Sequence, residues 1–164
     1  MTVPGYVTLY GNVLVSGAAA VFAITDYLYI EGNFGTADNG TLSLNCDCNP
    51  YLEVTGNIDF NGGSQVGKLG EGTIDLNGNF SAGAHPTAFI SEGVEVFLTG
   101  FTHTVSMTHP ETQTFQRLYI DRDVTHTTFT NGAVVNGEFG ENAEAGMIID
   151  GAGQLVVRGS IGIA

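Results

Sequence analysis

Carboxylates recur along the chain, two of them, Glu53 and Asp75, at matching positions, and they are the first residues whose spacing could support chemistry. The candidates are Glu53, Asp75, Glu95, Asp121 and Asp123, with Arg122 between the last two. Carboxylate pairs serve glycoside hydrolases, and a carboxylate beside a basic group suits a polysaccharide lyase. The sequence has only four Lys and Arg residues, so a basic group to stabilise an enolate is scarce. Alternating polar residues are also what any solvated strand needs, and we predict a protein without catalytic residues or a cofactor.

Histidines and cysteines are the other candidate ligands. No three of the four histidines share a spacing that would place them on one ion, and we expect ordinary solvated side chains at His85, His103, His109 and His126. The only two cysteines are Cys46 and Cys48, in a turn over residues 45–50. In an extended strand their side chains would lie about 7 Å apart, too far for a bond. Within the turn, a local disulfide, free thiols and an intermolecular bridge all stay open. Two thiols do not fill a four-coordinate zinc site, so we predict no metal site.

A repeated segment must position these residues. Each copy alternates apolar and polar residues and then turns, as in Leu52-Glu53-Val54-Thr55-Gly56-Asn57-Ile58. The eight copies begin at Val7, Leu28, Leu52, Ile74, Val96, Leu118, Ala133 and Leu155. Their turn residues are 21, 24, 22, 22, 22, 15 and 22 residues apart. A period of this length predicts a solenoid, and we interpret the short sixth interval as a trimmed coil.

The period-two alternation predicts strands whose first and third residues face inward. Glycine occupies the turn in seven of the eight copies, as expected where the backbone needs a positive φ or packs closely. Arg122 is the exception, and we expect a different bend there. Stacked in register, the strands would bury each coil on the next. We therefore predict an all-β fold, a right-handed parallel β-helix of about eight coils of roughly 22 residues, forming a single domain over residues 1–164.

Two rows of side chains should run along this solenoid. The outward row at the middle of the strands contains Thr8, Tyr29, Glu53, Asp75, Phe97, Tyr119, Val134 and Val156. Its central members form a tentative ligand or assembly face: Tyr29, Glu53, Asp75, Phe97 and Tyr119. Aromatic residues there could stack on sugars, pack on another protein, or simply suit a strand. A second row follows the glycines and contains Asn12, Asn33, Asn57 and Asn79, whose stacked amides would form a structural ladder.

Charge restricts the partners. The formal net charge of −13 repels phosphate backbones and anionic membrane surfaces, so we predict neither nucleic-acid binding nor membrane insertion. The stretch Val13–Ile24 has the length and small residues of a signal-peptide core, but no Lys or Arg precedes it. We assign it to a coil and expect any secretion signal to have been removed or to lie outside this sequence.

Three segments resemble the repeats of large bacterial surface proteins with β-helical stalks, the adhesin-like and autotransporter-like group. They are Gly72–Phe80, Val94–Gly100 and Thr112–Asp121. The resemblance covers most of the chain, and its motifs are those of a fold class. It implies a secreted or surface-attached stalk or fibre, and it brings no catalytic residues.

The two ends of the repeat suggest how such a protein would assemble. Residues 1–6 and 160–164 are short and mostly apolar, and uncapped solenoid ends favour end-to-end pairing. Our hypothesis is a non-catalytic extracellular or cell-surface structural protein, either a stalk or adhesin module or a fibre subunit. It would associate axially with its own copies and could carry a glycan or host-surface ligand. The alternative is a glycan-binding or carbohydrate-active β-helix that acts through the acidic and aromatic face.

Overall fold

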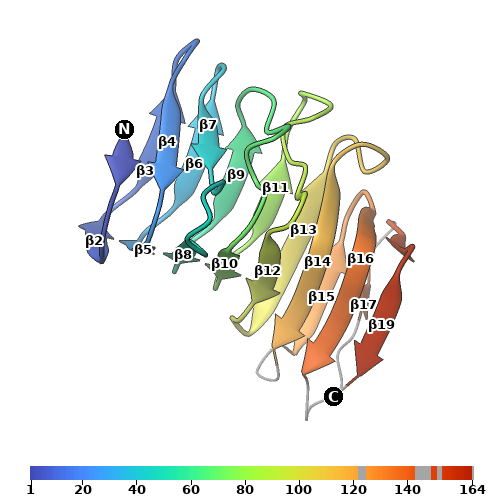
Figure 1. Cartoon of the computed structure of the whole chain (residues 1–164). Helices are drawn as coiled ribbons and strands as arrows, with labels where there is room; N and C mark the ends of the chain where they lie inside the picture. The colour runs from blue at the N-terminus through green and yellow to red at the C-terminus, as the bar shows by residue number, and fades with distance from the viewer. Residues whose placement is uncertain (122–124, 143–148, 151–152, 164) are drawn as a thin grey trace.

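The computed structural model describes residues 1–121, 125–142, 149–150 and 153–163. In this part of the chain every regular element is a strand, and the paired strands run parallel. They form a β-solenoid of about seven turns, and successive coils lie side by side from the N-terminal to the C-terminal end (Figure 1). The predicted all-β parallel solenoid is confirmed, with a coil count close to the expected eight.

The repeat forms one face of the solenoid, a nine-stranded sheet. From the N-terminal end its strands are β2 (Val7–Tyr10), β5 (Tyr27–Glu31), β8 (Tyr51–Val54), β10 (Thr73–Leu76), β12 (Glu95–Leu98), β14 (Thr114–Asp121) and β16 (Ala133–Asn142), and β16 pairs with both β18 (Leu155–Val157) and β19 (Ser160–Ile163). Copies pair in register, as Leu28 does with Leu52. In the five copies of the repeat that lie on β5, β8, β10, β12 and β14, the first and third residues are buried. This confirms the predicted inward positions.

Two further faces complete each coil. One is a seven-stranded sheet of β3 (Val13–Ser16), β6 (Phe34–Ala37), β9 (Ile58–Asn61), β11 (Phe80–Ala82), β13 (Thr102–Met107), β15 (His126–Phe129) and β17 (Ile149–Asp150). The other begins as the three strands β1 (Thr2–Val3), β4 (Val21–Ile24) and β7 (Thr41–Ser43). Beyond β7, loops over residues 62–72, 83–94 and 108–113 take the place of strands on this side of the coil. Phenylalanine rings from the strands and loops pack together in the core, with Phe80 and Phe89 centroids 4.8 Å apart.

Glycines stack at the corner that joins the first two faces. A Cβ atom at Gly56 would lie 2.6 Å from the carbonyl oxygen of Gly32, and one at Gly78 would lie 2.3 Å from that of Gly56. Such contacts are too short for any side chain, so close packing between coils requires glycine here. Gly11 also has a positive φ of 104°. Arg122, the expected exception, lies outside the described residues.

The last two copies do not align with the first six. Leu118 pairs with Phe139, whereas Val135 pairs with the upstream residue Phe115. A β-bulge in β16 leaves two residues opposite Gln116, and Leu155–Val157 pairs with the upstream part of β16. The predicted trimmed coil is therefore wrong, because the 15-residue interval compares two different points of the coil. Val134 and Val156 consequently leave the middle row, where Gly140 follows Tyr119.

Candidate functional site

The predicted ligand or assembly face is a straight line of neighbours on the nine-stranded sheet. Tyr29 pairs with Glu53, Glu53 with Asp75, Asp75 with Phe97 and Phe97 with Tyr119. All five side chains are partly exposed. The register thus brings together every residue of this face, although they come from five different coils.

A row of tyrosines runs beside this face, and the sequence reasoning missed it. The ring centroids of Tyr6 and Tyr27 are 4.7 Å apart, those of Tyr27 and Tyr51 are 5.2 Å apart, and the ring planes differ by 4° and 12°. Each of these tyrosines directly precedes a copy of the repeat, so extending the aligned segment by one residue would have revealed the row.

The carboxylates of the face are bound by their neighbours. The Tyr27 hydroxyl donates to Glu53, and the Tyr51 hydroxyl donates to Asp75 Oδ2 at 2.9 Å. The other oxygen of Asp75 accepts from the Thr99 hydroxyl at 2.6 Å. Burial, followed by these hydrogen bonds, raises the pKa of both Tyr27 and Tyr51. The two adjacent carboxylates are thus engaged as acceptors within the sheet.

Of the remaining acidic candidates, two lie on strands of the sheet and one lies outside the described residues. Glu95 forms an ion pair with Arg117 on the adjacent strand. Asp121 ends β14 and is partly exposed. Asp123, like Arg122, lies outside the described residues. Glu53 and Asp75 are direct neighbours in register, whereas Glu95 and Asp121 lie at other positions of their strands, opposite Arg117 and Asn142.

Two of the three aromatic rings on this face cover one another. Phe97 and Tyr119 stack with centroids 4.7 Å apart and planes 22° from parallel. On its other side, Tyr119 lies against Gly140, where a Cβ atom would be only 2.4 Å from the ring. A sugar stacks on an exposed aromatic face, whereas the Phe97 and Tyr119 rings cover each other within the row. Phe97 and Tyr119 therefore stack along the solenoid axis.

The four predicted ladder asparagines form a continuous row of hydrogen bonds. The Oδ1 atoms of Asn12, Asn33 and Asn57 accept the backbone N–H of the next asparagine at 2.9, 2.7 and 2.8 Å. Asn79 continues the row by accepting from the backbone N–H of Thr104 at 2.8 Å. Only the first step also has a contact between side-chain amides, from Asn33 Nδ2 to Asn12 Oδ1. The ladder thus depends on side-chain oxygens and backbone N–H groups rather than on stacked amides.

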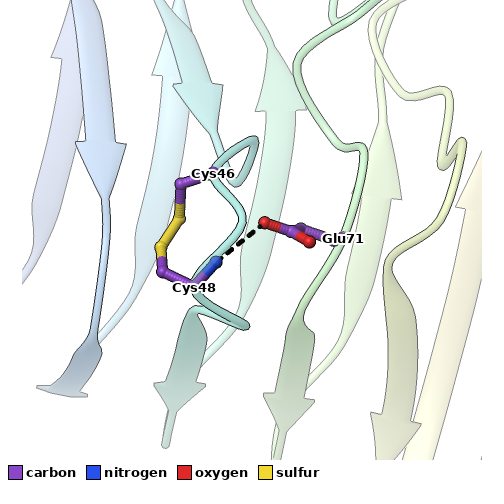
Figure 2. A group of neighbouring side chains, drawn as sticks. All are labelled: Cys46, Cys48 and Glu71. Carbon is purple, nitrogen blue, oxygen red and sulfur yellow. Dashed lines mark hydrogen bonds between the residues drawn. A yellow bond between two sulfur atoms is a disulfide. The ribbon is translucent and has the colours of Figure 1, made fainter.

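The two cysteines form a disulfide within their turn, with Cα atoms 5.2 Å apart. The backbone N–H of Cys48 donates to the carbonyl oxygen of Cys46 at 2.6 Å, so the chain is curled rather than extended. Glu71, from the next coil, accepts a second contact from the Cys48 N–H at 3.2 Å (Figure 2). Of the alternatives that the sequence left open, the structure contains the local bridge.

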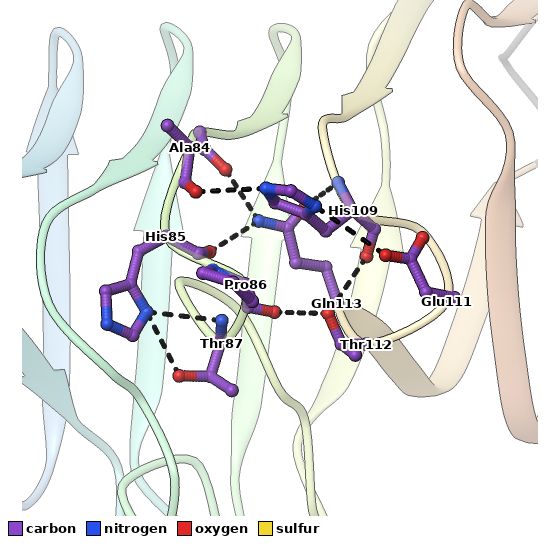
Figure 3. Close-up of polar contacts among 9 residues, drawn as sticks. Ala84, His85, Pro86, Thr87, His109, Glu111, Thr112 and Gln113 are labelled. Carbon is purple, nitrogen blue, oxygen red and sulfur yellow. Dashed lines mark hydrogen bonds and ion pairs between the residues drawn. The ribbon is translucent and has the colours of Figure 1, made fainter.

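Two of the histidines belong to a clamp between loops (Figure 3). The fully buried Gln113 donates from Nε2 to the carbonyl oxygens of Gly83 and His85, at 2.7 and 2.9 Å. Its Oε1 accepts the His109 N–H at 2.9 Å, and the His109 ring lies 3.0 Å from the carbonyl oxygen of Ala84. These contacts tie successive loops together on the third face, beyond β7, where loops take the place of strands.

His103 contradicts the expectation of solvated histidines. Its side chain is 2% exposed, and its ring nitrogens lie 2.6 and 3.3 Å from the carbonyl oxygens of Gly78 and Gly100. Burial lowers the pKa of this histidine. The residue faces inward because it is the second residue of β13, where the inward set of that strand begins. His126, which is partly exposed, pairs with Thr102 on the neighbouring strand.

Along β2 and β3, the first coil is covered on one side only. Three of its inward residues, Val7, Leu9 and Val13, are half-buried, whereas their second-coil partners are 0 to 1% exposed. The fourth, Val15, is buried. An open hollow of about 510 Å³ lies against this coil, lined mainly by apolar side chains. Among the described strands, β2 pairs only with β5, and β3 only with β6. This end of the solenoid thus presents both strand edges and apolar surface.

Comparison of the chain with family models, with curated proteins and with solved structures finds no match. The repeated parallel β-helix is present in the structure, but membership of the bacterial surface-protein group stays a proposal. In the described part of the chain, no helix has the length and hydropathy needed to cross a membrane.

Proposed function

We propose that this chain is a non-catalytic structural module of an extracellular or cell-surface stalk or fibre, and that its copies stack end to end. The observation that carries the proposal is the incompletely covered first coil. Val7, Leu9 and Val13 occupy positions that are fully buried in the second coil. Full burial of an aliphatic side chain stabilises by about 1.5–3 kcal/mol, so covering three of them favours association.

The opposite end offers a matching register. Downstream of the bulge in β16, pairing continues from strand to strand through the nine-stranded sheet, and Ile161 in β19 occupies the same position as Val7 in β2. Ile161 is 63% exposed. Placing β19 of one copy on β2 of the next would therefore set two apolar residues against each other and pair two strand edges. Such a head-to-tail contact does not close on itself, and it produces a filament.

The Cys46–Cys48 disulfide supports an extracellular location. Disulfides form and persist in oxidising compartments and are rare in reducing ones. The resemblance to bacterial surface repeats is in keeping with the same location. A stalk or fibre requires no catalytic groups, which agrees with carboxylates that bind neighbouring tyrosines and threonines.

The glycan-binding alternative receives less support. Two of its three aromatic residues, Phe97 and Tyr119, stack on each other, and its central carboxylates accept hydrogen bonds from within the sheet. At Phe97 and Tyr119 a sugar would meet ring edges rather than ring faces, which reduces the contact that drives sugar stacking.

Two adjacent alanines provide a matched test. Ala18 and Ala19 are both exposed in the turn after β3, but only Ala19 lines the hollow. We expect the unaltered chain to form filaments one solenoid wide in negative-stain electron microscopy as concentration rises. Ala19→Glu should shorten or abolish them, whereas Ala18→Glu adds the same charge and should leave them intact. Sedimentation velocity on the same samples measures the size distribution.

Salt supplies a second readout. Each copy carries a formal net charge of −13, so association should strengthen as rising ionic strength screens the repulsion between copies. Uniform monomers at every concentration and salt level would contradict the proposal. Equal effects of the two glutamate substitutions would contradict the assigned end. Binding of monomers to sugars on a glycan array would then favour the alternative.

A further inference from the structure

The Cys46–Cys48 turn holds a third potential ligand that is far away in the sequence. The sulfur atoms of Cys46 and Cys48 and a carboxylate oxygen of Glu71 all lie within 4.8 Å of one another. Figure 2 shows the Glu71 side chain directed at the cysteine turn from the neighbouring coil. Two thiolates and one carboxylate form a donor set that suits zinc, which binds sulfur at about 2.3 Å and carboxylate oxygen at about 2.0–2.2 Å.

We propose that reduction of this disulfide creates a zinc site formed by Cys46, Cys48 and Glu71. Three protein ligands leave the fourth tetrahedral position to water. A two-electron reductant cleaves the S–S bond and two protons convert the sulfurs to thiols. Zinc then displaces those two protons. The oxidised turn offers no thiolate, so the redox state decides whether zinc binds.

The ligands are held together by backbone contacts that do not involve the disulfide. The Glu71 N–H donates to the carbonyl oxygen of Leu44 at 3.1 Å, just before the cysteine turn. Next to Glu71, Gly72 packs so closely on Pro50 that a Cβ atom would lie 2.3 Å from the Pro50 carbonyl oxygen. These contacts on either side of the turn hold the two coils in register. Reduction therefore leaves the thiols beside the carboxylate.

Charge at the turn favours a cation over thiol chemistry. Asp47 lies between the cysteines and is exposed, and Glu71 is adjacent. Carboxylates near a thiol disfavour the thiolate, which is the nucleophile in disulfide exchange. A divalent cation reverses this effect, because it stabilises thiolates and carboxylate together. Since two protons leave, zinc affinity should increase with pH.

The test compares the reduced and oxidised chains. Tris(2-carboxyethyl)phosphine reduces the disulfide, the phosphine becomes its oxide, and water supplies the oxygen and the thiol protons. After anaerobic removal of the phosphine, zinc affinity is measured by competition with a chromophoric chelator. Cadmium is then added to report sulfur ligation through its thiolate charge-transfer absorption. We expect one metal ion per reduced chain and none on the oxidised chain.

Variants separate the three-ligand site from simpler binding. Glu71→Gln keeps an oxygen that can accept the Cys48 N–H but removes the carboxylate. Loss of a residue that only orients a metal ligand weakens metal binding by about 10- to 100-fold, so loss of a ligand itself should weaken zinc binding by at least as much. Glu92→Gln is the matched control, because Glu92 lies in the following coil and accepts the Gly67 N–H at 2.9 Å. Cys46→Ser should abolish the charge-transfer band.

Three results would overturn the proposal. Equal zinc binding by the oxidised chain would indicate general acidic sites. Unchanged affinity in Glu71→Gln would indicate a dithiol without the carboxylate. One zinc ion per two chains would indicate a bridge between molecules. Circular dichroism of the reduced chain without metal checks that the solenoid persists. A loss of zinc binding can then be distinguished from a loss of folding.

Discussion

The asparagine ladder should be sensitive to the loss of an acceptor and insensitive to the loss of an amide. Asn57 Oδ1 accepts the backbone N–H of Asn79 at 2.8 Å, while the Asn57 N–H donates to Asn33. Asn57→Ala removes one acceptor and leaves the Asn79 N–H without its partner. Asn57→Asp replaces the amide oxygen with a carboxylate oxygen, which can accept the same hydrogen bond. If the acceptor is what matters, alanine should destabilise the solenoid and aspartate should not.

The magnitude follows from one hydrogen bond at an exposed corner. A typical intramolecular hydrogen bond contributes about 0.5–1.5 kcal/mol net, and Asn57 is exposed, so water partly replaces it. We expect a loss of about 1 kcal/mol for Asn57→Ala, which in a chain of this size lowers Tm by about 2–4 °C. Urea unfolding followed by circular dichroism measures the free energy. Hydrogen exchange by NMR should show faster exchange of the Asn79 amide.

The control is Asn77→Ala, which removes an exposed asparagine from the same corner but outside the ladder. It should change the free energy of unfolding by less than about 0.5 kcal/mol. Moderate salt keeps the extra charge of Asn57→Asp from adding to the repulsion within an acidic protein. A loss in Asn57→Asp as large as that in Asn57→Ala would refute the reasoning and restore the amide-stacking interpretation.

Three further predictions concern other parts of the solenoid. Gly56→Ala places a Cβ atom 2.6 Å from the backbone of the preceding corner and should cost about 1–3 kcal/mol in urea unfolding, whereas Gly35→Ala, with its nearest contacts at 3.5 Å, should be tolerated. Burial lowers the pKa of His103 below its value of about 6.5 in the unfolded chain. The free energy of unfolding should therefore be unaffected by this histidine above about pH 6.5 and should fall as the pH decreases further. His103→Gln should flatten that dependence, His126→Gln should not, and an unchanged slope in His103→Gln would assign the effect elsewhere. The raised pKa of Tyr51 means that the unfolded chain loses its proton first, so stability should fall as pH rises above about 10, and less so in Tyr51→Phe.

Much of the fold could be predicted because, in a stacked repeat, the sequence pattern of each copy corresponds directly to its geometry. Alternation in Leu52-Glu53-Val54 specifies which side chains face the core, and a regular interval specifies which residues become neighbours. The middle row from Tyr29 to Tyr119 followed from these two facts alone. The prediction failed where the interval stopped marking the same point of the coil. The bulge in β16 made upstream residues resemble another copy of the repeat.

The features missed at the candidate sites have a similar cause. Glu71 lies one coil beyond Cys48, but the loop before it contains no repeat motif that would show the register. The expectation of a solvated His103 is wrong because the copy that begins at Val96 ends at Thr102, and the residues after it lack the inward pair of the pattern. Burial of His103 depends on the corner formed by Gly78 and Gly100. In both cases the neighbour across the coil decides the chemistry of the residue, and the residues adjacent in sequence do not.

Stacking in register also explains where function should be sought in this molecule. Along a regular face, each outward side chain has a neighbour about 4.8 Å away on both sides. Tyrosine rings therefore cover rings, and tyrosine hydroxyls bind the carboxylates of the adjacent coil, as Tyr51 binds Asp75. The more regular the face, the fewer groups it leaves for a ligand. Groups available for other partners collect where the stack is interrupted: at the first coil, where Val7 and Leu9 lack a covering strand, and at the turn where Cys46 and Cys48 meet Glu71.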